Sequence, residues 1–149
     1  MLAILLPRGI RNNNPGNIRL SKTVWQGQRP ASLDADFAEF TTALYGLRAL
    51  MKTLLTYYLK YNLDTVGSII NRFAPPHENA TDAYIYAVTQ ALKVKRTDKI
   101  DLTAKPLLTA LTRAIVLREN GHPPAGRPPG WYAPELYEEA ANLVLPLTA

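Results

Sequence analysis

The 149-residue sequence predicts a mainly α-helical (α+β) protein with a small β element, a hairpin, near the N-terminus. Three observations support this. Apolar residues recur every three or four positions in several stretches after residue 43, as on helices with one buried face. The segment before them is polar and rich in turn residues. Hydrophobic residues make up 47% and charged residues 19%, which is a globular composition, and the length fits one domain over residues 1–149.

The N-terminal segment is predicted to hold the β element. Residues 1–7 (MLAILLP) are apolar but too short to span a bilayer, and they lack the basic start and cleavage site of a secretory signal. We therefore expect a packed arm or short strand there, no cleavable signal peptide and no stable membrane insertion. Asn-Pro-Gly at 14–16 is a strong turn signal, and its flanks would form the small hairpin. The segment 34–42 is expected to be extended.

Five helices are expected in the rest of the chain. Thr41 or Thr42 would cap the first, and Asp64 or Thr65 the second, which Pro75-Pro76 would break. Asn79 or Thr81 would cap the third. A charged linker and a proline-rich loop separate the remaining two. The expected ranges are about 43–61, 64–74, 79–94, 105–119 and 134–145.

Glu119 stands at the end of the helix expected at 105–119, just before Asn120 and Gly121. At 100° per residue it continues the stripe formed by Leu108, Leu111, Thr112 and Ile115. Partial burial and the carbonyls of the helix C-terminus would both favour a protonated Glu119, as a general acid requires. Alternatively, the helix ends at Arg118, and Glu119 points into solvent or pairs with an arginine. The spacing alone does not decide between these readings.

The segment AIVLRENGHPPAG (114–126) resembles the catalytic segment of lytic transglycosylases and related lysozyme-like muramidases. In those enzymes a helix that ends in glutamate-serine-glycine carries the single essential glutamate. This chain has Ala114 and Ile115, then Glu119, Asn120 in place of the serine, and Gly121. The resemblance therefore implies that Glu119 is the catalytic residue.

A second resemblance covers roughly residues 8–95. The stretches RGIRNNNPGNIR, FAEFTTALYGLRALMKTLLTYY and NRFAPPHENATDAYIYAV are similar to a family of phage and prophage proteins labelled virion structural or lysozyme-like. Thr81, Tyr84 and Val88 also resemble the tyrosine-bearing helix near the active site of cell-wall glucosaminidases and transglycosylases. In the usual lysozyme-like fold the glutamate helix precedes the β segment, whereas here it follows. A circular permutation would explain this order.

Together the resemblances imply a peptidoglycan-degrading glycosidase, either a lytic transglycosylase or a muramidase. Glu119 would be general acid and base on the bond between N-acetylmuramic acid and N-acetylglucosamine. By residue type we expect substrate-binding roles for Asn14, Gly16, Asn17, Trp25, Arg72 and Tyr84. The alternatives are a purely structural turn at 14–17, a core tyrosine at 84, a loop anchor at Trp25 and a solvated Arg72. Among the other acids no second catalytic carboxylate is evident, although Asp34 or Asp36 could hold a water.

The expected partners are peptidoglycan glycan strands and other phage structural proteins. The net charge of +5 suits an anionic polymer, and without a helix-turn-helix or zinc motif we do not expect nucleic-acid binding. With no cysteine and only His77 and His122, we expect no metal site and no cofactor. The setting would be a phage particle or the periplasm or cell wall of its host. The alternative function is a non-catalytic virion structural or peptidoglycan-binding protein.

Overall fold

The computed structural model describes residues 5–146, and within that range the secondary structure is helical except for isolated β-bridges. The mainly α-helical prediction is confirmed. The five predicted helices are present with bounds close to those expected, and the short helix α1 was not predicted. The helices are α1 (Arg8–Arg11), α2 (Ala43–Tyr61), α3 (Val66–Phe73), α4 (Thr81–Leu92), α5 (Lys105–Asn120) and α6 (Pro134–Val144).

The first two predicted helices begin at predicted caps. The hydroxyl of Thr42 accepts the backbone N–H of Tyr45 at the start of α2. Thr65 forms a capping box with Ser68 at the start of α3. Such caps satisfy backbone donors that the first helical turn leaves free.

The cap predicted for α4 is wrong. Ala80 occupies the cap position and makes no side-chain cap bond. Thr81 instead donates its hydroxyl to the Ala74 carbonyl at 2.5 Å, and the Asn79 amide donates to the Pro75 carbonyl at 3.3 Å. Both side chains therefore fix the loop between α3 and α4.

The end of α5 settles one open alternative. The helix continues through Asn120 and stops at Gly121, whose φ of 76° suits glycine. The alternative in which the helix ends at Arg118 is therefore wrong. Glu119 is partly buried in the last turn of a formed helix.

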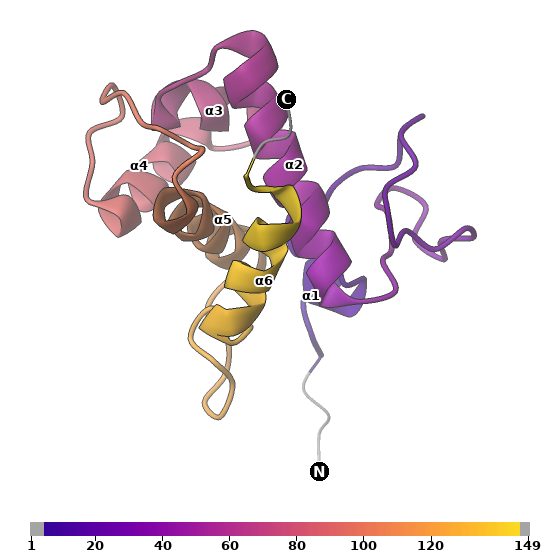
Figure 1. The fold of residues 1–149 in the computed structure, drawn as a ribbon. Coiled ribbons are helices and arrows are strands. Elements are labelled where there is room, and N and C mark those ends of the chain that lie inside the picture. Colours follow the sequence, from indigo (N-terminus) through magenta and orange to yellow (C-terminus); the bar gives the residue numbers. More distant parts are fainter. Residues whose placement is uncertain (1–4, 147–149) are drawn as a thin grey trace.

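The core lies around α2, which packs against α5 and α6, while α4 packs against α3 and α5 (Figure 1). The helices bury the predicted apolar faces. None of the helices in the described part of the chain is both long and apolar enough to cross a bilayer. The largest fully buried side chains are those of Phe40, Leu47, Leu50, Met51, Leu54, Ile69, Ile70, Ile85, Leu102, Leu108, Leu111 and Ile115.

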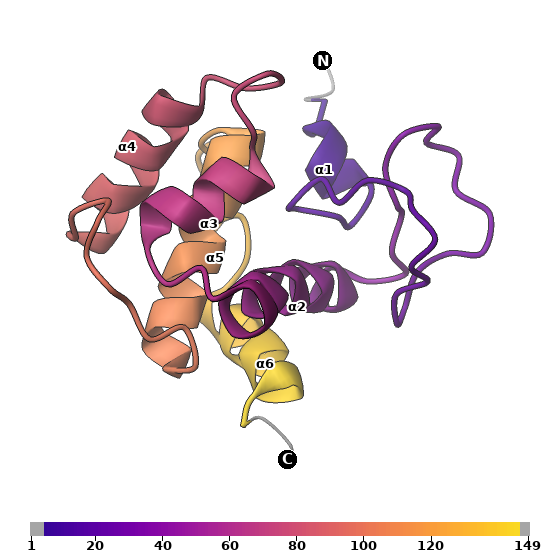
Figure 2. The same cartoon turned by 90° about the horizontal axis from the view of Figure 1, so that it is seen from above.

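Residues 12–42 form a lobe of loops, called the front lobe, on the opposite side of α2 from α3 and α4 (Figure 2). The small hairpin predicted there is not confirmed. Within the described residues the flanks of the Asn-Pro-Gly turn do not pair with each other. Instead, Leu20 donates its N–H to the Asp36 carbonyl, and Ala38 donates to the Ile18 carbonyl. The β element thus pairs segments some eighteen residues apart.

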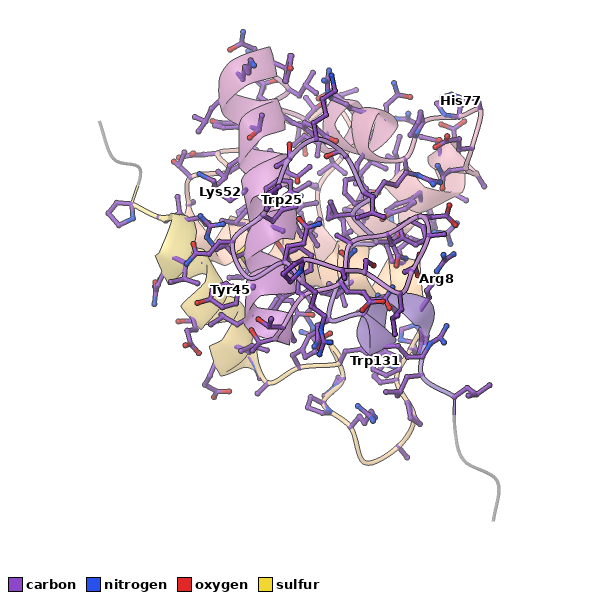
Figure 3. All side chains as sticks on the ribbon, turned by 90° about the vertical axis from the view of Figure 1, so that its right-hand side faces the viewer. Arg8, Trp25, Tyr45, Lys52, His77 and Trp131 are labelled. Atoms are coloured by element: carbon purple, nitrogen blue, oxygen red, sulfur yellow. The ribbon has the colours of Figure 1, made fainter. Side chains whose placement is uncertain are left out.

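Two smaller features complete the lobe. Trp25 lies across the side of α2 (Figure 3), where it packs with Ala38, Phe40 and Ala49. Residues 1–4 of the predicted N-terminal arm lie outside the described residues. In the described part of the arm, Leu6 packs against the core and Leu5 is exposed.

Candidate active site

Glu119 accepts two hydrogen bonds from distant parts of the chain. The side-chain amide Nδ2 of Asn17, 102 residues earlier, donates to Oε1 at 3.0 Å. The Tyr84 hydroxyl, from α4, donates to Oε2 at 2.8 Å. The carboxylate therefore has a defined orientation at the junction of α4, α5 and the Asn-Pro-Gly-Asn turn. The Asn-Pro-Gly-Asn turn thus lies against the end of α5.

Tyr84 is a buried donor to the glutamate. Its side chain is buried in the core, as the core alternative expected, but its hydroxyl reaches Glu119. Burial raises the pKa of Tyr84 well above its ordinary value of 10, and the neighbouring Glu119 raises it further. Tyr84 therefore keeps its proton and remains a donor. The guanidinium of Arg118 lies 5.5 Å from the centre of the tyrosine ring.

The turn that carries Asn17 is held from inside by Asn14. The amide of Asn14 donates to the carbonyls of Ile18 at 2.9 Å and Ala38 at 2.8 Å, and its oxygen accepts the N–H of Ile18. Its side chain is fully buried and has no free face for a ligand. The expectation of a substrate contact from Asn14 is therefore corrected: its polar atoms are used to fold the turn. Asn17 adopts a φ of 50°, which asparagine tolerates better than most residues.

A second contact fastens the turn to the end of α5. The Asn120 amide donates to the Pro15 carbonyl at 2.8 Å and to the Val116 carbonyl at 2.9 Å. Asn120 is the residue that stands where the resembling enzymes have serine. Because it follows Glu119 directly, its bond to Pro15 fixes the distance between the turn and the carboxylate.

A groove of about 490 Å³ opens beside Glu119. One wall comes from the front lobe, the other from the end of α3 and the loop that follows, and α2 contributes between them. The groove brings together Glu119 and four predicted residues, namely Gly16, Asn17, Trp25 and Arg72. The other lining residues are Ile18, Arg19, Phe37, Thr53, Tyr57, Phe73, Ala74, Pro75, Glu78 and Asn79.

Two arginines line the groove without an ion-pair partner among the described residues. The guanidinium of Arg72 lies 3.9 Å from the ring centre of Tyr61 and 5.1 Å from that of Tyr57. Arg19 lies 5.2 Å from the ring centre of Phe37. Stacking on aromatic rings orients a guanidinium and leaves its edge donors available to an anion. The groove therefore presents positive charge to a ligand.

Asp34 and Asp36, considered above as holders of a water, lie outside this groove. Arg8 binds both, at 2.6 Å to Asp34 and 3.1 Å to Asp36, and Asn12 donates to Asp34 at 2.9 Å. The hydrogen bond from Arg8 holds the pKa of Asp34 well below its usual range, and backbone N–H donors act in the same direction. These bonds fasten the front lobe to α1.

The structure gives roles to several residues for which no role was predicted. Trp131 is buried and donates its indole N–H to the Gly121 carbonyl at 2.8 Å, so it anchors the loop after α5. Arg19, Tyr57 and Glu78 also line the groove, although none of them was predicted as a site residue. Tyr57 belongs to α2, a helix that the apolar spacing predicted, whereas no local pattern distinguished Glu78. No group of three or more metal-binding side chains occurs among the described residues.

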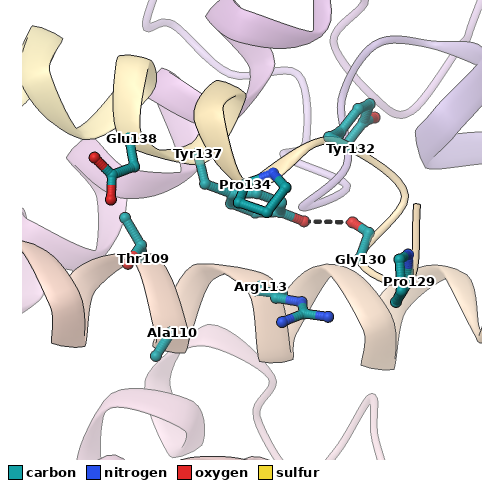
Figure 4. Close-up of a pocket in the computed structure, with 9 residues that line it drawn as sticks. All are labelled: Thr109, Ala110, Arg113, Pro129, Gly130, Tyr132, Pro134, Tyr137 and Glu138. Atoms are coloured by element: carbon teal, nitrogen blue, oxygen red, sulfur yellow. Dashed lines mark hydrogen bonds between the residues drawn. The ribbon is translucent and has the colours of Figure 1, made fainter.

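A second hollow lies between α5 and α6 (Figure 4). It has a volume of about 240 Å³, and Arg113, Tyr132, Tyr137 and Glu138 are among its lining residues. The Tyr137 hydroxyl donates to the Gly130 carbonyl at 2.6 Å, which secures the loop before α6. The hollow does not include Glu119. The groove beside Glu119 is therefore the better candidate for a catalytic site.

Comparison with known proteins identifies a phage relative. Over 120 residues the chain is 38% identical to protein P5 of Pseudoalteromonas phage PM2. The matched segment covers 78% of this chain and 73% of the relative. The expected connection with phages is thus supported. The name of the relative states no activity. No family model matches the chain.

Proposed function

We propose that this chain, which belongs to the family of protein P5 of Pseudoalteromonas phage PM2, is a glycosidase that cleaves the glycan strands of peptidoglycan. The observation that carries the proposal is the geometry of Glu119. Its carboxylate borders a groove and is oriented by Asn17 and Tyr84 through hydrogen bonds of 3.0 and 2.8 Å. An oriented carboxyl group beside an open groove is what acid–base cleavage of a glycosidic bond requires.

In the proposed reaction Glu119 first acts as an acid. It gives a proton to the oxygen that links the muramic acid residue to the glucosamine, and the bond from the sugar C1 to that oxygen breaks through an oxocarbenium-like state. Glu119, now a carboxylate, then takes the proton of the muramyl 6-hydroxyl as that oxygen bonds to C1. The products are a 1,6-anhydro end and a free glucosamine end, and Glu119 is protonated again.

The absence of Asp34 and Asp36 from the groove favours this transglycosylase route. Arg8 already binds both carboxylates, so neither is free to place a water opposite Glu119. Glu78 is the other carboxylate that lines the groove, and it lies in the exposed loop after α3. If Glu78 activates a water instead, the enzyme is a hydrolase of the muramidase kind, and the products differ accordingly.

The proposed fold is lysozyme-like in a permuted order. A helix that ends in the catalytic glutamate faces a turn that binds the glutamate, as the resemblance implies, but the turn precedes the helix in the chain. The stacked Arg19 and Arg72 would meet the carboxylates of the stem peptides or other anionic groups of the wall. The proposed place of action is the host cell wall, with the protein carried by the phage particle or produced for lysis.

The decisive experiment compares the unmodified protein with Glu119→Gln on purified peptidoglycan. Mass spectrometry of released muropeptides measures the products, because anhydro and reducing ends differ by one water. We expect release of anhydro muropeptides, lost in Glu119→Gln and kept in the control Glu135→Gln, an exposed acid on α6. Glu78→Gln distinguishes the routes, since only a hydrolase would need it. If the unmodified protein binds peptidoglycan but releases nothing, it is a binding protein and the enzymatic proposal is wrong.

A further inference from the structure

Two buried amide oxygens near Glu119 have no hydrogen-bond donor. They are Oδ1 of Asn17 and Oδ1 of Asn120. Both lie against the same side of Gly9, where a Cβ atom would stand 2.8 Å from the first and 2.6 Å from the second. The backbone oxygen of Asn14 lies 2.9 Å from the same point. Three acceptors therefore lie close to one place, and the Asn14 oxygen already accepts the backbone N–H of Asn17 at 2.9 Å. The two side-chain oxygens are left without a donor, which is uncommon for buried acceptors in folded proteins.

The proposed reaction gives Glu119 two states with opposite needs. As a carboxylate it accepts hydrogen bonds, and the amide nitrogen of Asn17 supplies one. As an acid it carries a proton, and this proton needs a hydrogen-bond acceptor until the leaving oxygen takes it. Tyr84 is a buried donor in the observed arrangement. Asn17 can supply either partner, because the oxygen and nitrogen of an amide have nearly the same shape.

We propose that the side-chain amide of Asn17 turns by half a rotation as Glu119 gains and loses its proton. With Glu119 as carboxylate, Nδ2 of Asn17 donates to Oε1, as observed. With Glu119 as acid, Oδ1 of Asn17 accepts the proton of Oε1. The nitrogen then faces the side where Oδ1 of Asn120 lies, and that oxygen gains the donor that it lacks.

This inference rests on the proposed function for its purpose, whereas its NMR readouts do not require activity. Asn17 becomes a positioning residue that serves both the acid and the base step. Gly9 leaves space for the oxygens of both asparagine side chains, which lie 2.8 and 2.6 Å from the place of its missing Cβ atom. The serine of the resembling enzymes is shorter than Asn120, so in this chain Asn120 would be the acceptor that supports the turned amide.

Several charged or titratable groups near Glu119 must be held constant in any test. Tyr84 faces it from α4, and Arg118 precedes it on α5 and lies over the tyrosine ring. Arg19, Arg72 and Glu78 share its groove. All five remain in the variants below, so a change in the titration of Glu119 reports on Asn17.

The test is Asn17→Gly, compared with Asn62→Gly as a matched control. Both asparagines have positive φ, 50° and 56°, so glycine fits the backbone at each, and Asn62 lies at the end of α2 away from the groove. Carbon-13 NMR follows the titration of the Glu119 carboxyl without substrate. Because Asn17 would stabilise both forms, we expect its removal to move the midpoint by less than about half a pH unit. The release of muropeptides should fall about tenfold or more on both sides of the pH optimum.

Three outcomes would overturn the proposal. A midpoint raised by about one pH unit or more would mean that Asn17 only donates to the carboxylate. Side-chain amide signals of Asn17 that do not change across the titration of Glu119 would mean that the amide does not turn. If Asn17→Gly does not fold, Asn17→Asp keeps the shape, and a Glu119 titration unaffected by the added carboxyl would show that this side chain does not face Glu119. The titration midpoint and the amide signals can be measured on an inactive protein, whereas muropeptide release cannot, so failure of the glycosidase proposal is distinguishable from failure of this one.

Discussion

The substitution Gly9→Ala would test how α1, the Asn-Pro-Gly-Asn turn and the end of α5 fit together. Gly9 is buried, and an added Cβ would lie 2.6 Å from the Asn120 oxygen and 2.8 Å from the Asn17 oxygen. A comfortable carbon–oxygen contact is about 3.3 Å or longer. The two oxygens would therefore have to move by roughly 0.5 to 0.7 Å, which displaces the amide that holds Glu119.

The magnitude follows from two opposing effects. Overpacking of this kind costs about 1 to 3 kcal/mol, whereas alanine in a helix gains up to about 1 kcal/mol over glycine. We expect the free energy of unfolding to fall by about 1 to 2 kcal/mol. Because a displacement of about 1 Å can cost a hundredfold in rate, a shift of half that size should lower kcat/KM about tenfold.

Urea unfolding measures the first effect, and muropeptide release per folded molecule measures the second. Gly67→Ala is the control, since its Cβ in α3 would lie 3.0 Å from the Arg96 carbonyl oxygen, away from the groove. The control should lose stability but keep its activity per folded molecule. A Gly9→Ala protein as stable and as active as the unmodified one would refute the packing argument.

Two further predictions concern single hydrogen bonds. Tyr84→Phe keeps the ring but removes the hydrogen-bond donor to Glu119. Because a hydrogen bond to a charged group contributes about 1.5 to 3 kcal/mol, kcat/KM should fall about ten- to a hundredfold. Steady-state kinetics at matched stability measure this, and an unchanged rate would contradict the role of the hydroxyl. The pKa of Asp34 is lowered in the folded protein, so its contact with Arg8 stabilises the fold above the unfolded pKa of about 4, and this contribution is lost as the pH falls below that value. Asp34→Asn should therefore be less stable at pH 7 and lose stability less steeply between about pH 4 and 2. Urea unfolding across that range would measure the free energy of unfolding of both proteins. Identical slopes of this free energy against pH would count against the ion pair.

The sequence alone determined the helices of this protein, because their causes are local. Apolar spacing along α2 placed its buried face, and Thr42 and Thr65 marked the starts of α2 and α3. Glu119 was recognisable because it continues an apolar stripe at the end of α5, just before Gly121. These features depend on residues within one or two helical turns, which a single sequence displays directly.

The tertiary structure decided which side chains meet. Nothing near Asn14 or Asn17 shows that one amide turns inward to fold the loop while the other reaches Glu119. The pairing of residues 18–20 with 36–38, and the entry of Glu78 into the groove wall, also join segments far apart in the chain. Long-range contacts arise from packing of several elements at once, so no short stretch of sequence contains their signal.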